Sequence, residues 1–114
     1  MLKYTRTHEW VKLEGETAWV GITDHAQKEL GDIVYIELPK VGHEVKEGDS
    51  TAVLESTKAA ADFYSPISGT ILEVNEELKK DSGLINRSPE KEGWIYKVKP
   101  SNIQELDRLL PIDD

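Results

Sequence analysis

The 114-residue sequence contains no cysteine and only one methionine, Met1. Without cysteine the chain can form no disulfide, no thiol nucleophile, no cysteine-based metal site and no Cys-x-x-Cys redox pair. Any redox chemistry in which the protein takes part must therefore come from another group, bound or attached.

Long apolar runs are also absent. No stretch approaches the roughly 20 apolar residues that a membrane-spanning helix requires, and a strand-like motif already begins at Leu2, which leaves no room for a signal or transit peptide. We therefore expect a protein without membrane contact, in the cytoplasm of a bacterium, or in the mitochondrial matrix if the chain is a mature eukaryotic one.

Positive charge is scarce, since 14 lysines and arginines stand against 22 aspartates and glutamates, a net charge of −8. Such a field repels phosphate backbones and favours partners with basic faces. The glycine-rich fingerprints of dinucleotide and phosphate binding are missing as well. We expect neither nucleic acid nor nucleotide as a ligand.

Patterns for catalysis and metal binding are incomplete. His8-Glu9 begins like a zinc-protease helix, but Lys12 stands where the second histidine would have to be. Asp24-His25 lacks a partner, because no cysteine exists and no serine lies in a Gly-x-Ser-x-Gly context. The sequence therefore predicts no catalytic residue and no metal site.

Short runs rich in valine, isoleucine and tyrosine, separated by glycine and proline turns, make up most of the chain. These runs cover residues 18–22, 33–38, 51–55, 63–65, 70–74 and 94–98. A chain of 114 residues fits one domain with a modest core. The pattern predicts a small, mostly antiparallel β body.

Two helices are predicted beside these strands. Asp24 can cap a short helix through Leu30 that Gly31 ends, with His25 in its first turn. Ser101 or Asn102 can cap a second helix over about 102–110. The second helix would pack on the β body through an apolar face and end at Pro111; that face would consist of Ile103, Leu106 and Leu110.

Lys58 draws attention because it lies between two β-prone runs and next to the three alanines at 59–61. A hairpin tip at this position would lift its primary amine into solvent, and the alanines would leave room for an acylating enzyme. Most lysines on small domains are merely solvated surface charge, so position alone does not establish a modification.

The segment Glu55-Ser56-Thr57-Lys58-Ala59 resembles the lipoyl-attachment hairpin of the glycine cleavage system H protein family, whose usual form is Glu-Ser-Val-Lys-Ala. Further landmarks of that family occur in the same order and spacing and cover nearly the whole chain. They include Thr7-His8-Glu9-Trp10-Val11, Thr23-Asp24-His25-Ala26-Gln27, Leu30-Gly31-Asp32, Ser65-Pro66-Ile67-Ser68-Gly69 and Gly93-Trp94.

The resemblance implies a mainly β fold, the flattened barrel-sandwich hybrid of lipoyl and biotinyl domains, with short helices including one at the C-terminus. The lipoyl-binding core would span about 17–99 of a single domain, 1–114. A faint echo between 31–49 and 69–83 fits the two-fold related sheets of that fold. Biotin carriers place methionine on both sides of the lysine, whereas Thr57 and Ala59 flank Lys58. The implied cofactor is therefore lipoate, attached covalently at Lys58.

The resemblance also implies a carrier with no turnover of its own. A lipoyl ligase or transferase would load Lys58, and the arm would take the aminomethyl group of glycine from a pyridoxal-phosphate glycine decarboxylase. It would pass this group to a tetrahydrofolate-dependent aminomethyltransferase, and dihydrolipoamide dehydrogenase would reoxidise it. Tethering raises the effective concentration of the arm at each of these sites.

In this family the loaded arm folds back into a cleft, and the matching positions here are Thr7, Glu9, Glu29 and Asp62. Glu9 and Asp62 could pair with the protonated amine of the cargo. In the structural alternative, Asp62 only closes the hairpin, Glu9 pairs with a nearby lysine, and Glu29 is an exposed helix glutamate.

Three departures from the family pattern leave other functions open. Thr57 replaces the usual valine, Glu90 stands where an aromatic often follows the proline, and the sequence stops at Asp114, where relatives usually continue. One alternative is a lipoyl donor that relays lipoate to other complexes. An alternative of another class is an unmodified acidic binding module.

Overall fold

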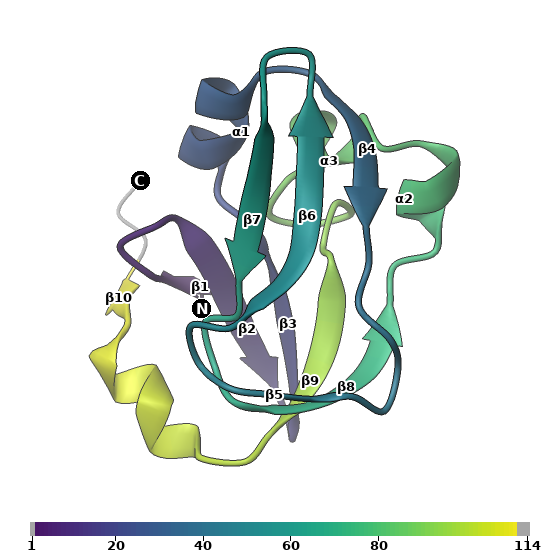
Figure 1. Cartoon of the computed structure of the whole chain (residues 1–114). Helices are drawn as coiled ribbons and strands as arrows, with labels where there is room; N and C mark the ends of the chain where they lie inside the picture. Colours follow the sequence, from purple (N-terminus) through teal and green to yellow (C-terminus); the bar gives the residue numbers. More distant parts are fainter. Residues whose placement is uncertain (1, 112–114) are drawn as a thin grey trace.

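The computed structural model describes residues 2–111, which form two antiparallel β-sheets with short helices at their edges (Figure 1). The larger sheet has the strand order β10-β1-β2-β3-β9-β8-β5, and the smaller has the order β4-β6-β7. The described body is flattened, with extents of 36 × 32 × 21 Å. This architecture confirms the prediction of a mainly β barrel-sandwich hybrid.

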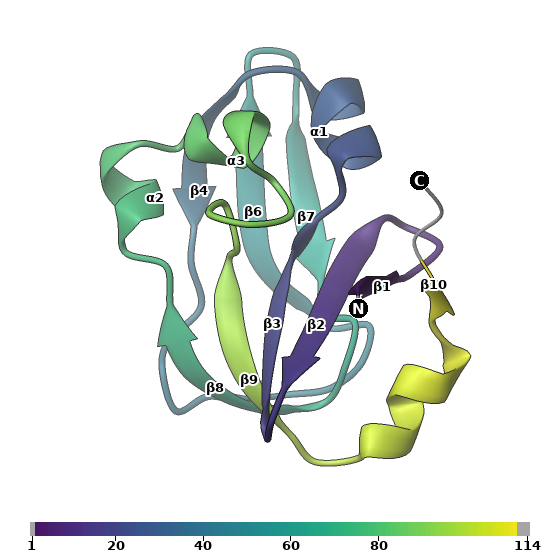
Figure 2. The same cartoon turned by 180° about the vertical axis from the view of Figure 1, so that it is seen from behind.

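The larger sheet contains strands from both ends of the chain, and Figure 2 shows β3 and β9 side by side within it. Its hairpin between β2 and β3 turns at Gly15, whose φ of 59° favours glycine. The strands are β1 (Leu2–Tyr4), β2 (Glu9–Glu14), β3 (Thr17–Ile22), β5 (Glu44–Val45), β8 (Gly69–Val74), β9 (Tyr96–Pro100) and β10 (Leu110–Pro111).

The smaller sheet consists of β4 (Ile33–Glu37), β6 (Ser50–Ser56) and β7 (Ala60–Tyr64). β6 and β7 form a hairpin whose strands pair from Ser50 opposite Tyr64 to Glu55 opposite Ala60. β7 thus begins three residues before the predicted run 63–65. The small alanines at its start can adopt the extended conformation once β6 supplies the backbone partners.

The core lies between the two sheets. Phe63 of β7 and Tyr96 of β9 are both fully buried and meet edge to face, with ring centroids 5.6 Å apart. Such a contact adds about 0.5–1.5 kcal/mol to the burial of the two rings. Alternating side chains of both sheets complete the core, among them Val11, Val20, Leu54, Ile71 and Val98.

The first helix, α1 (Asp24–Leu30), ends at Gly31 and carries His25 in its first turn, as predicted. Its N-cap is Thr23 rather than Asp24, since the Thr23 hydroxyl accepts a hydrogen bond of 3.1 Å from the amide of Ala26. Asp24 is instead the first helical residue, where its negative charge favours the helix N-terminus. Two single-turn helices follow later, α2 (Glu77–Lys80) and α3 (Leu84–Arg87).

The C-terminal helix differs from the prediction. It is a 3-10 helix, η1 (Ile103–Arg108), capped by Asn102, and it ends before Leu110. Leu110 pairs with Tyr4 in the larger sheet. The edge of β1 offers hydrogen-bond partners to the backbone of Leu110, and these partners would stay unused if the helix continued. Ile103 is 57% exposed and Leu110 45%, so of the predicted apolar face only Leu106 packs against the core. The buried residue of η1 is Glu105, which accepts hydrogen bonds from the amide and hydroxyl of Ser68.

None of the helices within residues 2–111 has the length and apolar character needed to span a membrane.

Candidate functional site

Lys58 lies at the tip of the β6–β7 hairpin, at one end of the molecule, and its side chain is exposed (Figure 1). The hydroxyl of Ser56 accepts hydrogen bonds from the amides of Lys58 and Ala59, each 3.1 Å long. The amide of Ser56 in turn donates to the carbonyl of Ala59 at 2.8 Å. The turn is therefore held by Ser56 and the backbone, without help from the lysine side chain.

The tip is also attached to the body of the molecule. The amide of Thr57 donates to the carbonyl of Asp32 at 3.0 Å. The stem of Lys58 lies over Gly31 at the end of α1, where an added Cβ would approach Cε of Lys58 to 3.2 Å. Gly31 has a φ of 83°, so it both ends the helix and leaves room for the stem. Sequence reasoning did not foresee this second role of Gly31.

Among residues 2–111, no ion pair involves Lys58. An exposed primary amine on a fixed turn, with no carboxylate paired to it among residues 2–111, can enter the active site of an acylating enzyme without breaking an ion pair. The small side chains around it at 59–61 add no steric barrier. These features fit covalent attachment of a carboxylic acid such as lipoate.

Glu9, at the start of β2, is the buried carboxylate of the predicted cleft, with only 4% of its surface exposed. The hydroxyls of Thr5 and Thr7 both donate to its Oε1, the Thr5 bond being 2.6 Å long. The structure thus brings the hydroxyl of Thr7 and the carboxylate of Glu9 together. Thr5 was missed; it meets Glu9 because the chain turns between them, with the amide of His8 donating to the carbonyl of Thr5 at 3.0 Å.

Burial raises the pKa of Glu9 above its ordinary value, because the carboxylate loses solvating water. Hydrogen bonds from Thr5, Thr7 and the backbone of Tyr64 oppose this rise only in part. No lysine forms an ion pair with Glu9 in the described part of the chain, so the structural alternative for Glu9 is wrong. A buried carboxylate in this state would gain from a neighbouring cation.

Trp10 fixes the strand that carries Glu9. Its ring is fully buried, and its Nε1 donates to the carbonyl of Pro89 at 2.9 Å. A Cβ at Gly21, on the paired strand β3, would come within 2.8 Å of the ring, so this position has to remain glycine. The packing holds the start of β2, and with it the backbone of Glu9, in one place.

Glu29 lies on α1, and its Oε1 lies 2.6 Å from Nε2 of His25 one turn earlier. The ring of His25 lies 4.4 Å from that of His8, and the ring of His8 stacks on Tyr4. Glu29 therefore reaches the Glu9 segment only through two histidines. Its own side chain is largely exposed, which fits the alternative of a surface helix glutamate.

His8 has a positive φ of 67°, which is unusual for a residue other than glycine. Its carbonyl accepts a hydrogen bond of 3.0 Å from the amide of Thr23, next to the start of α1. Through this hydrogen bond His8, the residue before Glu9, connects the N-terminal segment to the start of α1. The array of Tyr4, His8 and His25 could not be found from the sequence, since His25 lies on α1, well apart in the chain from Tyr4 and His8.

Asp62 lies on β7 opposite Val53, with an exposed side chain. Its Oδ1 accepts a hydrogen bond of 3.0 Å from the hydroxyl of Ser50, across the hairpin. This contact agrees with the alternative in which Asp62 closes the hairpin. Within residues 2–111 no hydrogen bond joins Asp62 to Glu9, although Tyr64, two residues further along β7, provides a backbone contact to Glu9.

Comparison with known proteins places this geometry in context. The model of the family described as glycine cleavage H-protein matches residues 2–114. The glycine cleavage system H protein of Thermotoga maritima is 57% identical over 110 residues, which cover 96% of this chain and 89% of the relative. That of Acinetobacter baumannii is 54% identical over 109 residues, or 96% and 88%.

A mitochondrial relative and a solved structure extend the similarity. The mitochondrial glycine cleavage system H protein of Flaveria trinervia is 56% identical over 109 residues, which cover 96% of this chain and 66% of the relative. The crystal structure of a glycine cleavage system H protein from Mycobacterium marinum superposes with a TM-score of 0.87 at 38% identity. It covers 96% of this chain and 88% of that one.

Proposed function

The chain belongs to the glycine cleavage H-protein family, and on this basis we propose that Lys58 carries lipoate as a covalent amide. The family is the lipoyl carrier of the glycine cleavage system, and the protein is a carrier component rather than an enzyme. The proposal concerns the residue that bears the group and the residues that receive its cargo.

The observation that carries the proposal is the exposed amine of Lys58 on a turn held by other residues. The deprotonated amine attacks the activated carboxyl carbon of lipoate, an amide bond forms, and the activating group leaves while the nitrogen gives up a proton. The lysine loses its positive charge and gains a long neutral arm. When attached, the lipoyl group supplies the disulfide chemistry that a chain without cysteine cannot provide.

Glu9 is the proposed receptor for the protonated amine of the cargo. A buried carboxylate with a raised pKa is destabilised in its charged form, and a nearby ammonium would lower this pKa and stabilise the charge. Thr5 and Thr7 both donate to Oε1, so neither hydroxyl occupies Oε2. Asp62 and Glu29 would act at the edges of the cleft, since Ser50 and His25 already bind them.

The proposed partners follow from the family. They are the lipoyl ligase or transferase that loads Lys58, the pyridoxal-phosphate glycine decarboxylase, the tetrahydrofolate-dependent aminomethyltransferase and dihydrolipoamide dehydrogenase. Relatives from bacteria and from plant mitochondria support a place in the bacterial cytoplasm or, in a eukaryotic host, in the mitochondrial matrix. The whole chain would serve these partners as one carrier domain.

The test is intact-mass measurement of the protein from its native host, followed by peptide mapping. The expected result is a mass increase of one lipoyl group, located at Lys58. The proposal would be overturned if protein isolated from a host with active glycine cleavage lacked this mass increase. Lipoate located on another lysine would also overturn it. An arginine variant at position 58 serves as the control, because arginine keeps the positive charge but is not acylated.

A further inference from the structure

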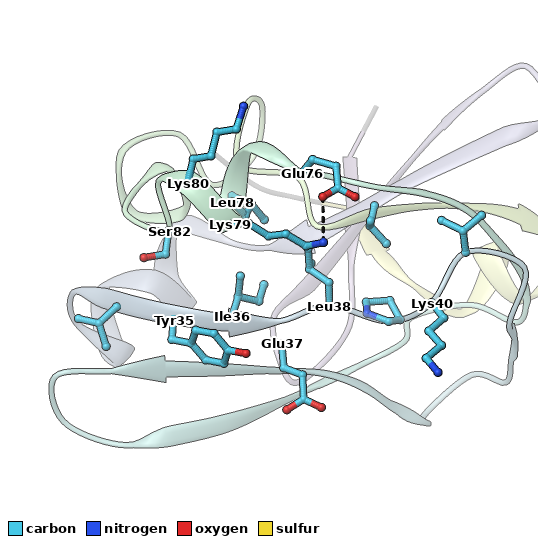
Figure 3. A pocket seen from close by; sticks show the side chains of 14 residues that line it. Tyr35, Ile36, Glu37, Leu38, Lys40, Glu76, Leu78, Lys79, Lys80 and Ser82 are labelled. Atoms are coloured by element: carbon cyan, nitrogen blue, oxygen red, sulfur yellow. Dashed lines mark ion pairs between the residues drawn. The ribbon is translucent and has the colours of Figure 1, made fainter.

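A groove runs along β4, at the outer edge of the smaller sheet, between this strand and α2 (Figure 3). It has a volume of about 690 Å³ and extends along the chain from Val34 to Val41. Tyr35, Leu38 and Lys79 are among the side chains that line it. The glycine cleavage role assigned above leaves this groove without a function.

The groove exposes apolar side chains for a definite reason. The pairing of β4 with β6 shifts register between Ile33 and Tyr35, and this bulge leaves both Ile33 and Ile36 buried. Val34 and Tyr35 therefore both face outward, 58% and 54% exposed. Bulges at sheet edges commonly re-aim side chains in this way.

Most of the large apolar side chains that are more than half exposed within residues 2–111 lie at this groove. Within residues 2–111, four large hydrophobic side chains are more than half exposed. Three of them, Val34, Tyr35 and Val41, line the groove, and the fourth, Ile103, lies on η1. Clustered exposure of this kind marks a contact surface rather than scattered surface residues.

The charges of the groove oppose those of the protein as a whole. Three lysines and two glutamates line it, namely Lys40, Lys79, Lys80, Glu37 and Glu76, whereas the chain carries a net charge of −8. Lys79 pairs with Glu76 at 2.9 Å, as Figure 3 shows. Lys40 and Lys80 take part in none of the ion pairs of residues 2–111. Glu37 is likewise absent from these ion pairs, so two lysines and one glutamate are left without an ion-pair partner among residues 2–111. The lining therefore has a small excess of positive charge, which complements carboxylates on a partner.

The groove begins beside the hairpin tip. Ile33 of β4 pairs with Ser56, and the carbonyl of Asp32 accepts the amide of Thr57, the residue before Lys58. A protein interface of ordinary size buries about 800 Å² on each partner. An interface that includes Lys58 would therefore also cover the first residues of β4.

We propose that this groove is the docking surface for the enzyme that acylates Lys58, and that this enzyme presents an apolar side chain ringed by carboxylates. The inference rests on the proposed lipoylation of Lys58. Before acylation the lysine has only its own short stem, so the enzyme has to bind close to the hairpin. The tip itself offers only small side chains at 57 and 59–61, whereas Val34 and Tyr35 offer apolar anchors.

The first test measures acylation of the unmodified protein by the lipoate-attaching enzyme of its own host, supplied with its activated lipoate donor and followed by intact mass. The double variant Val34→Ser, Tyr35→Ser should lower kcat/KM about tenfold, mainly through a higher KM, because apolar anchors contribute to binding. The control Ile103→Ser, an equally exposed apolar residue outside the groove, should leave kcat/KM unchanged.

The second test concerns charge. Lys80→Glu should lower kcat/KM about threefold to tenfold at low salt, and the loss should shrink at high salt. Lys99→Glu, an exposed position on β9, changes the net charge equally and should have a much smaller effect. Equal effects of the two substitutions would mean that only the net charge of the protein matters, and would overturn the groove as the docking surface.

Other outcomes separate this inference from the proposed function. Normal acylation of a folded Val34→Ser, Tyr35→Ser variant would overturn the docking surface and leave Lys58 as the lipoyl site. A concentration-dependent dimer that this variant disrupts, with acylation unchanged, would assign the groove to a second copy of the chain and likewise overturn the proposal. A wild-type protein that is not acylated at Lys58 would overturn both.

Discussion

Lys58 and Lys97 are the same residue type in opposite surroundings. Lys97 on β9 lies 4.0 Å from the ring of Trp19 and 4.9 Å from that of Trp94, and it pairs with Glu73 at 3.1 Å. Its side chain is only 19% exposed. Lys58 has no ion-pair partner among the described residues and lies on an exposed turn. The contrast indicates that a lysine open to modification is one whose amine has no ion pair and no aromatic ring beside it.

Two buried glutamates, Glu105 and Glu9, show the same contrast between a side chain held by its neighbours and one with room for a further contact. Glu105 accepts one hydrogen bond on each oxygen, both from Ser68 at 2.7 Å, and so connects η1 to the loop before β8. Glu9 receives both threonine hydroxyls on a single oxygen. Both oxygens of Glu105 thus fix one element to another, which is a structural role. No side chain of residues 2–111 donates to the second oxygen of Glu9, so beside the backbone contact of Tyr64 this carboxylate keeps acceptor capacity for an ammonium group.

The largest effect is expected at Lys58. Lys58→Arg should abolish lipoylation and carrier activity, while the thermal midpoint stays within about 1–2 °C of the wild type, because an exposed surface substitution changes stability little. Intact mass and a thermal melt measure the two quantities. Lipoate that remains on the variant would contradict Lys58 as the lipoylated residue. A large loss of stability would show that the side chain of Lys58 has a structural role.

The cleft is expected to show the next largest effect. In the lipoylated protein, Glu9→Gln should shorten the lifetime of the aminomethyl cargo on the arm by about tenfold, since a charge-assisted hydrogen bond would be lost. Asp62→Asn should shorten it much less, because Ser50 already binds Asp62. Mass spectrometry of the loaded protein gives both lifetimes.

An unchanged cargo lifetime in a folded, fully lipoylated Glu9→Gln protein would exclude Glu9 as the receptor. Reoxidation of the dithiol by the flavin enzyme serves as the control, because that step does not involve the amine. It should proceed at the wild-type rate in both variants. A slower reoxidation would indicate that the substitution disturbs the arm as a whole rather than its cargo.

Lys97 should behave in the opposite way to Lys58. Lys97→Met keeps the apolar stem but removes the charge over the two indole rings, and it should cost about 1 kcal/mol of unfolding free energy. The thermal midpoint should then fall by about 4 °C with lipoylation unaffected. Lys99→Met, an exposed lysine on the same strand, is the matched control and should change neither quantity. Equal stability of the two variants would contradict the structural role of Lys97.

The site was predictable from the sequence only where its parts are neighbours in the chain. The hairpin tip depends on residues 56–60, so Lys58 could be placed from local pattern alone. The carboxylate of Glu9 is contacted by the backbone of Tyr64, and the aromatic array beside it joins His25 of α1 to Tyr4 and His8. These contacts arise when distant strands and α1 pack together, which no local pattern reports.

The errors in the fold have the same origin. The apolar spacing at 103–110 predicted a helix that continues to Leu110, but β1, at the other end of the chain, recruits Leu110 into the larger sheet. At the start of α1, Thr23 and Asp24 are both good capping residues, and local sequence gave no reason to prefer Thr23. β2 is not among the predicted runs and depends on pairing with β3 and β1.

The smallest effect concerns the pH dependence of stability. Since burial raises the pKa of Glu9, the folded state holds this proton more tightly than the unfolded chain does. The stabilisation from the bound proton is present below the ordinary value of 4.5 and is lost as pH rises through the folded-state pKa. Glu9→Gln, which resembles the protonated form, should therefore be more stable relative to the wild type at pH 7 than at pH 4.

Asp24 provides a control of opposite sign. Hydrogen bonding from Gln27 and the neighbouring Lys28 lower its pKa below 3.8. The stabilisation from its charged form is therefore present above that value and lost as pH falls through the folded-state pKa, so Asp24→Asn should cost stability at pH 7 and little at very low pH. Chemical denaturation of both variants across this pH range decides the matter. If Glu9→Gln followed the Asp24→Asn pattern, hydrogen bonds to the carboxylate would outweigh its desolvation, and Glu9 would need no ammonium partner.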